Sequence, residues 1–109
     1  MKGELSPVYS KQQLEHILEE AMIYMCACPA QVAEQLIRLR ELFAYQKKCI
    51  SDSDLMKDVH TRIAESTRKA HAEMEQCLSE VLQMEGWDPH TLSMPAGLRQ
   101  LREKIIDQD

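Results

Sequence analysis

Apolar residues recur along much of the chain at alternating steps of three and four positions, which is the spacing of one face of an α-helix. In the first run these positions are Leu14, Leu18, Ala21, Met25 and Cys28. Ser10 and Gln13 come just before it with the spacing of a capping box, in which each side chain bonds the other residue's backbone N–H. The pattern predicts a first helix that begins at Ser10 and is stopped by Pro29, because the residue before a proline avoids the α conformation.

Two longer runs follow the first. The second predicts a helix over residues 29–50, with Pro29 in its first turn and a stripe at Val32, Leu36, Leu39, Phe43, Gln46 and Ile50. Ser51 and Asp54 again have capping-box spacing and predict a third helix over residues 53–85, which Gly86 ends. The third stripe contains Ile63, Thr67, Ala70, Met74, Cys77, Val81 and Met84. Its middle, residues 65–72, is mostly polar, which leaves open whether that part is exposed, kinked or a site.

The period of these stripes is close to 3.5 residues and the connections are short, which together favour antiparallel neighbouring helices. The chain has only three Gly and four Pro, and aromatic residues make up 5% of it, which excludes a turn-rich β protein. We therefore predict an all-α fold, an antiparallel helical bundle of three main helices plus a short C-terminal helix. Residues 1–9 are expected to fray, and residues 10–107 to form a single helical bundle domain.

Charge and hydropathy narrow the classes of partner. The net charge is −5 and no basic stripe is visible, which argues against nucleic acid. No apolar run approaches the roughly 18 residues of a membrane span, and the first residues lack the apolar segment of a secretory signal. We therefore expect a cytoplasmic protein, away from membranes, whose four cysteines are reduced.

The expected hairpin geometry gathers sulfur atoms at one end of the bundle. If the second and third helices pair about Asp52, a rise of about 1.5 Å per residue places Cys77 level with Cys28. The candidate metal ligands at this end are Cys26, Cys28, Cys77, Met22, Met25 and Met74. Thiolates and thioethers suit Cu(I), and thiolates also suit Zn. The Cys28-Pro29 dipeptide resembles the Cys-Pro motifs that bind haem through the thiolate in some regulatory proteins.

The alternative is that these sulfur side chains only fill the core, because Cys and Met are common core residues and lie here on the apolar stripes. Residues two apart on a helix point about 200° apart, so Cys26 and Cys28 can share a metal only if Cys28 lies beyond the helix end. We therefore expect no cofactor, with Cu(I), Zn or haem bound by the sulfur ligands as the alternative.

No combination of residues predicts catalysis. His16 with Glu20, and His71 with Glu75, have the i, i+4 spacing that is typical of surface pairs on Glu-rich helices. The Glu-x-x-His sequence of di-iron bundles does not occur, and neither does a Gly-rich phosphate loop. We therefore predict that the chain is not an enzyme.

Interaction is the better-supported function. The third helix extends about eight residues beyond the expected level of the hairpin end, and this overhang is apolar. The candidate interface residues are Leu78, Val81, Leu82 and Trp87 with Leu98, Leu101 and Ile105 of the last helix. Either the last helix covers the overhang, or a second copy does so in a symmetric dimer, with Tyr24 and Trp87 as aromatic anchors. We predict a small helical protein-interaction or regulatory module that forms a homodimer and binds a protein partner.

Overall fold

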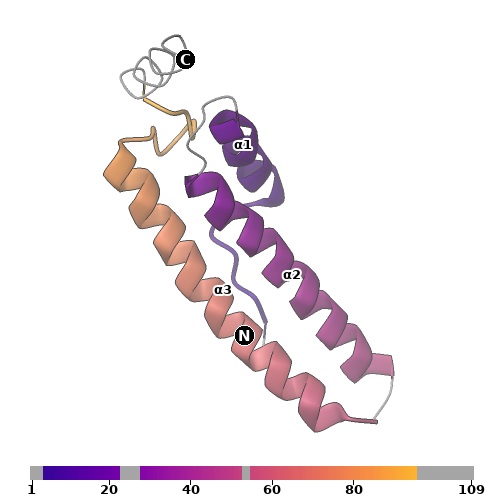
Figure 1. Cartoon of the computed structure of the whole chain (residues 1–109). Coiled ribbons are helices and arrows are strands. Elements are labelled where there is room, and N and C mark those ends of the chain that lie inside the picture. Colours follow the sequence, from indigo (N-terminus) through magenta and orange to yellow (C-terminus); the bar gives the residue numbers. More distant parts are fainter. Residues whose placement is uncertain (1–3, 23–27, 53–54, 96–109) are drawn as a thin grey trace, which may run out of the picture.

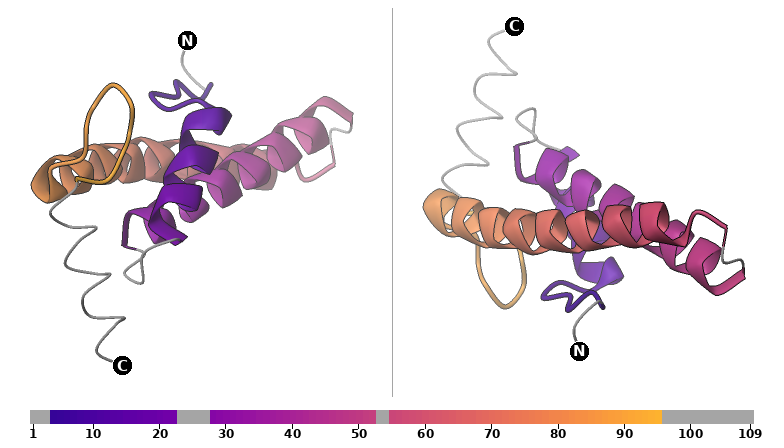
Figure 2. Two further views of the ribbon diagram at one scale, coloured as in Figure 1. Left: turned by 90° about the horizontal axis from the view of Figure 1, so that it is seen from above. Right: turned by 90° about the horizontal axis from the view of Figure 1, so that it is seen from below.

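The computed structural model describes residues 4–22, 28–52 and 55–95, and within them the fold is all-α without strands. Three helices follow one another, α1 (Lys11–Met22), α2 (Cys28–Asp52) and α3 (Lys57–Glu85). Helices α2 and α3 form a long antiparallel hairpin, and α1 packs on α2 near the end of the hairpin farthest from its connection (Figure 1). Figure 2 shows that α1 lies across the hairpin rather than along it. The predicted helical bundle is confirmed, while the predicted C-terminal helix lies outside the described residues.

The capping box at the start of α1 is confirmed. The backbone N–H of Gln13 donates to Ser10 Oγ at 3.1 Å, and the N–H of Ser10 donates to Gln13 Oε1 at 2.8 Å. These bonds satisfy N–H groups that a helix start leaves without a partner. The predicted end of this helix differs, because Cys28 belongs to α2 and α1 is described only as far as Met22. Pro29 is buried in the first turn of α2, where its missing N–H costs nothing.

The connection between α2 and α3 differs from the sequence prediction. Ser51 does not cap α3, because α2 continues through Ser51 to Asp52, with neither Gly nor Pro there to stop it. Helix α3 instead begins at Lys57 after Met56, whose φ of 61° is left-handed and whose side chain makes no capping bond. The connection is therefore centred between Asp52 and Lys57. This places Cys77 level with Val32, about one turn beyond the predicted level of Cys28.

Helix α3 is continuous from Lys57 to Glu85, so the polar stretch at residues 65–72 does not break it. It ends at Gly86, as predicted, in a Schellman motif. The N–H of Gly86 bonds the carbonyl of Gln83, and the N–H of Trp87 bonds the carbonyl of Leu82. The φ of Gly86 is 78°, a conformation that costs glycine little because it has no Cβ.

The chain reverses after Trp87 in a turn organised by Asp88. Its carboxylate accepts the N–H groups of His90 and Thr91 at 2.8 and 2.9 Å, and these bonds lower the pKa of Asp88. The turn brings Leu92 and Met94 back onto the core. The N–H of Met94 then donates to Glu20 Oε1 of α1 at 3.0 Å, which ties the end of this segment to the first helix.

The core lies where all three helices and the segment after α3 meet. Its buried residues are Leu14, Ile17, Ala21, Ala30, Ala33, Leu36, Leu78, Leu82, Trp87, Leu92 and Met94. On α3 the buried face is Ala64, Thr67, His71, Glu75, Leu78 and Leu82. The predicted stripe shares only Thr67 with this face, because a 3.5-residue period and a preference for apolar residues select Ile63 before it and Ala70, Met74 and Cys77 after it. Ala70 is exposed, and Met74 and Cys77 are only half-buried.

Candidate functional site

Two buried polar residues on α3 meet a third residue from α2 in the middle of the hairpin. His71 is 1% exposed and Glu75 is 4% exposed, so the predicted surface pair is wrong. Arg40 of α2 donates from Nε to His71 Nε2 at 2.9 Å and from Nη2 to Glu75 Oε2 at 3.3 Å. We call Arg40, His71 and Glu75 the polar cluster.

Residues 4–9 cover the polar cluster, and we call this segment the strap. It runs beside the α2–α3 hairpin from the start of α1 (Figure 1), although the sequence predicted that residues 1–9 fray. Glu75 Oε2 accepts the backbone N–H groups of Val8 and Tyr9 at 2.7 and 3.0 Å. Arg40 Nη2 donates to the carbonyl of Tyr9 at 2.6 Å. An ion pair of 3.2 Å between Glu4 and Lys47 fixes the far end of the strap.

The hydrogen bonds define the protonation state of His71. An arginine Nε only donates, so His71 Nε2 must accept and the imidazole must be neutral with its proton on Nδ1. Nδ1 lies 3.6 Å from Glu75 Oε1. Burial is the largest effect on this histidine and lowers its pKa, Arg40 lowers it further, and Glu75 opposes both. The polar cluster therefore holds a neutral histidine between a cation and a carboxylate.

The sequence contained a signal for this cluster that the prediction missed. His71 and Glu75 are in helical phase with Leu78 and Leu82, both buried, at steps of four, three and four. Polar residues on the buried face of a helix need partners, because an unpaired buried polar group is costly. The phase shared with Leu78 and Leu82 therefore favours an interior position for His71 and Glu75, although the spacing of the pair alone does not decide it. Nothing in the spacing identified Arg40 or the strap as their partners.

The predicted sulfur cluster is only partly within the described residues. Cys26 and Met25 lie outside them, as does the side chain of Met22. Cys28 is exposed at the first residue of α2, Cys77 is half-buried, and Met74 packs against the core. Within residues 4–22, 28–52 and 55–95, no group of three or more His, Cys, Asp or Glu side chains is arranged to hold a metal ion.

The predicted apolar overhang is largely covered by the chain itself. Leu78, Leu82 and Trp87 are buried in the core, and Val81 is half-buried. Met84 is 83% exposed. The remaining predicted interface residues, Leu98, Leu101 and Ile105, and the predicted anchor Tyr24 lie outside the described residues. Leu78, Leu82 and Trp87 are therefore covered by the chain itself and not by a second copy.

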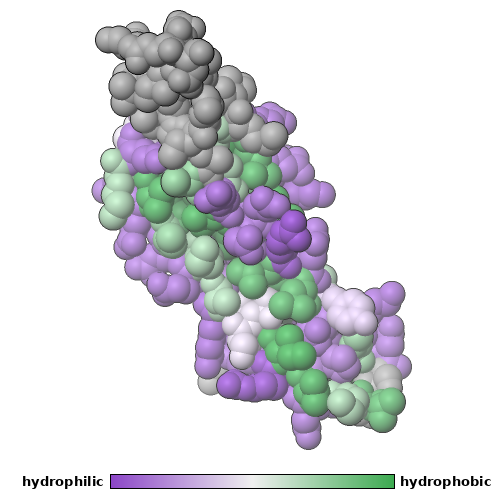
Figure 3. Space-filling model, in the orientation of Figure 1, coloured by the Kyte–Doolittle hydropathy of each residue, from purple (hydrophilic) through white to green (hydrophobic). Residues whose placement is uncertain are grey.

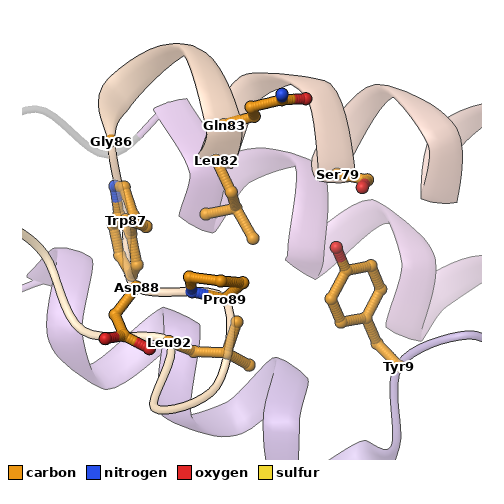
Figure 4. A pocket seen from close by; sticks show the side chains of 9 residues that line it. All are labelled: Tyr9, Ser79, Leu82, Gln83, Gly86, Trp87, Asp88, Pro89 and Leu92. Carbon is orange, nitrogen blue, oxygen red and sulfur yellow. The ribbon is translucent and has the colours of Figure 1, made fainter.

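A cavity of about 350 Å³ lies between the strap and the turn after α3. Figure 4 shows the ring of Tyr9 on one side and Trp87, Pro89 and Leu82 on the other, with the Tyr9 hydroxyl directed toward the helix that carries Ser79. This volume falls in the range of small-molecule pockets. Because Tyr9 forms one wall, the cavity depends on the position of the strap.

Exposed apolar side chains gather at the other end of the molecule. We call residues 42–52 and 55–62 the hairpin tip, and its exposed apolar residues Leu42, Tyr45, Leu55, Met56 and Val59 the tip patch. Their exposed fractions range from 41% for Leu42 to 76% for Leu55. Figure 3 shows hydrophobic surface reaching the lower end of the hairpin.

Comparison with known proteins gives no relative from which a role could be inferred. None of the described helices is long and apolar enough to cross a membrane. No protein-family model, curated protein or solved structure matches this chain.

Proposed function

We propose that this chain is a protein-interaction module that forms a symmetric homodimer through the hairpin tip. The observation that carries the proposal is the tip patch, five large apolar side chains that are 41–76% exposed on the facing ends of α2 and α3 and on the connection between these helices. Single exposed apolar residues are ordinary, but a contiguous group of them is typical of an interaction surface.

The construction of the hairpin tip supports this proposal. In the part of the chain that the structure describes, the tip is built from α2 and α3, and the strap reaches it only through the ion pair of Glu4 with Lys47. The side chains buried near the tip are Phe43, Gln46, Ala64 and Thr67. Gln46 Oε1 lies 2.6 Å from His60 Nδ1, and Thr67 Oγ1 donates to the carbonyl of Ile63 at 2.7 Å. Only the first of these contacts joins the two helices, and it lies beside the buried Phe43 and Ala64. The large apolar residues of the tip patch remain outside, where burying them in a partner is favourable.

A hollow of about 450 Å³ accompanies the tip patch. Tyr45, Cys49, Leu55, Met56 and His60 line it, together with Lys48 and Asp52. Concave apolar pockets of this kind receive the anchor side chains of protein interfaces. The hollow therefore offers a place for an apolar side chain of the partner.

A second copy is the occupant that these features favour. Two helical hairpins that pair side by side complete a four-helix bundle, in which each hairpin covers the apolar face of the other. A two-fold axis uses the same patch twice, so one interface covers both copies. Lys48 and Asp52 at the rim of the hollow have opposite charges, so a two-fold arrangement is able to place one opposite the other.

The test is the oligomeric state of the full chain, measured by sedimentation equilibrium over a range of concentrations. We expect a dimer in the wild type, and a dissociation constant at least about tenfold weaker in Leu55→Glu and in Val59→Glu. Both side chains are exposed, so circular dichroism should show unchanged helix content in the two variants.

Met84→Glu is the matched control. Met84 is 83% exposed on α3, the helix of Val59, but at the end opposite the tip, so the dissociation constant should stay at the wild-type value. A wild-type protein that sediments as a monomer throughout would overturn the homodimer. A dimer weakened by Met84→Glu and not by Leu55→Glu would move the interface away from the hairpin tip.

A further inference from the structure

At the polar cluster the strap is held through its backbone. Glu75 accepts two successive N–H groups, those of Val8 and Tyr9, and Arg40 donates to the carbonyl of Tyr9. The side chain of Val8 is 71% exposed and takes no part in this binding. The polar cluster thus recognises an extended peptide backbone, with the ring of Tyr9 as the accompanying side-chain contact.

The binding depends on the neutral form of His71. Arg40 supplies Nε to His71 and Nη2 to both Tyr9 and Glu75, so the histidine orients the guanidinium that holds the strap. A proton added to His71 Nε2 would face the N–H of Arg40 Nε, and the bond of 2.9 Å would become a contact between two donors. The two would also both be cations in a buried site.

The charged groups around His71 come from both helices. Arg40 of α2 opposes a positive imidazole, and Glu75 of α3 favours one, at 3.6 Å from Nδ1. The strap contributes the Tyr9 carbonyl, which bonds Arg40 rather than the histidine. Burial and the charge of Arg40 lower the pKa of His71 more than the charge of Glu75 raises it, so this pKa lies below its ordinary value while the strap is bound.

We propose that Arg40, His71 and Glu75 form a proton-gated binding site for an extended peptide backbone, occupied in this structure by the chain's own strap. The sign follows from linkage. A histidine whose pKa is lowered when the strap is bound favours the bound form above its ordinary pKa of about 6.5, and this preference is lost as the pH falls below that value. Acid therefore releases the strap. Release removes Tyr9 from the cavity beside Trp87 and frees the polar cluster for another extended segment.

The test is hydrogen exchange of the Val8 and Tyr9 amides in the full chain, followed by NMR and expressed as protection relative to the unstructured rate at each pH. In the wild type we expect protection of both amides to fall by up to about tenfold per pH unit below pH 6.5, the limit for one proton. Core amides of α2 should not follow this change. Protection of Val8 and Tyr9 that is independent of pH would overturn the proton gate.

Two variants separate the histidine from other titrating groups. In His71→Gln a side-chain carbonyl still accepts from Arg40 but cannot be protonated, so protection should become independent of pH. His60→Gln is the control, because His60 is also on α3 and also has a hydrogen bond to α2. In this variant the pH dependence should be retained. If the pH dependence were lost in His60→Gln and kept in His71→Gln, His71 would not be the residue whose protonation releases the strap.

A second pair of variants tests backbone recognition without altering the polar cluster. Val8→Pro removes the N–H that Glu75 accepts at 2.7 Å, whereas Val8→Ala keeps it and trims an exposed side chain. We expect Tyr9 protection at pH 7.5 to fall about tenfold in Val8→Pro, which corresponds to the loss of one charge-assisted hydrogen bond, and to remain unchanged in Val8→Ala. Equal protection in the two variants would show that the strap is not held through its backbone.

Discussion

The two ends of the α2–α3 hairpin consist of the same two helices but bury their side chains differently. At the end where α1 packs, eleven residues from α1, α2, α3 and the segment after α3 form one continuous apolar core. At the hairpin tip the described parts of α2 and α3 pack mainly on each other, with one ion pair from the strap to Lys47, and five large apolar residues are exposed. A pair of helices can bury only the narrow stripe along which they touch. A third element is what converts the hairpin into a folded core.

The polar cluster lies between these two regions, where the element that covers the hairpin changes from α1 to the strap. Toward α1 the hairpin is covered by apolar side chains such as Leu14 and Ile17, whereas at Arg40, His71 and Glu75 it is covered by the strap's backbone. A backbone brings unpaired N–H and carbonyl groups, which require polar partners when they are buried. The polar residues on α3 therefore match the kind of element that covers them.

The largest difference in stability between the two ends is expected from leucine-to-alanine changes. Leu36 is fully buried on α2, and Leu36→Ala should lower the free energy of unfolding by about 2–5 kcal/mol, through lost burial and the cavity that remains. Leu42→Ala on the same helix removes a side chain that is 41% exposed and should cost below about 1 kcal/mol. Urea denaturation of both variants measures the difference. At protein concentrations where the chain is monomeric, equal losses would mean that Leu42 is as well buried as Leu36 within a single copy.

An intermediate effect is expected at the polar cluster. Glu75→Gln keeps one carbonyl oxygen but removes the charge and places an N–H₂ group among the donors of Val8, Tyr9 and Arg40. We expect a loss of about 1.5–3 kcal/mol in urea denaturation, the range for hydrogen bonds to charged groups. Glu73→Gln, at an exposed position of the same helix, should change the free energy of unfolding by less than about 0.5 kcal/mol. If the two variants were equally stable, the buried carboxylate would add nothing to the fold.

The smallest of these effects is expected at the end of α3. Gly86→Ala has space for the new methyl group, whose nearest neighbour is the side chain of Pro95 at 3.9 Å. The cost is therefore conformational, about 1 kcal/mol for alanine at a φ of 78°. Thermal denaturation should show a correspondingly small decrease in Tm, with Gln83→Ala in the preceding turn close to the wild type. A larger decrease for Gly86→Ala would indicate that the Schellman motif also positions Trp87 in the core.

The sequence was sufficient to predict the elements that depend on neighbouring residues. Ser10 with Gln13, and Gly86, each act within one helical turn and have their predicted roles. Pro29 lies in the first turn of α2 as predicted, but the predicted end of the first helix at Cys28 was wrong, because Cys28 belongs to α2. The prediction was wrong where an element is set by distant contacts. The face of α3 shifts by one position after Thr67 because His71 and Glu75 are buried by residues 31 to 67 positions away. The left-handed Met56 at the start of α3 also had no signal, since nothing in its side chain favours that conformation.

The candidate site also separates what neighbouring residues determine from what distant contacts determine. Spacing alone brought His71 and Glu75 to one helix face, but an i, i+4 histidine–glutamate pair is equally compatible with a surface and with an interior. What decides between them is the strap, a segment whose sequence has neither helical periodicity nor strand alternation. The strap binds through backbone groups, which every residue except proline supplies alike. A contact of that kind leaves almost no trace in the choice of side chains.

The distance in sequence between the strap and its partners also bears on the order in which the chain folds. The bond from Val8 to Glu75 spans 67 positions, and that from Met94 to Glu20 spans 74. Closing so long a loop in an unfolded chain carries a large entropic cost, whereas the α2–α3 hairpin needs only a short connection. The hairpin is therefore expected to form first and to carry α3 back to the place where the strap docks. Bonds made after the rate-limiting step change the unfolding rate and not the folding rate. The strap thus governs how long the folded molecule persists and not how quickly it forms.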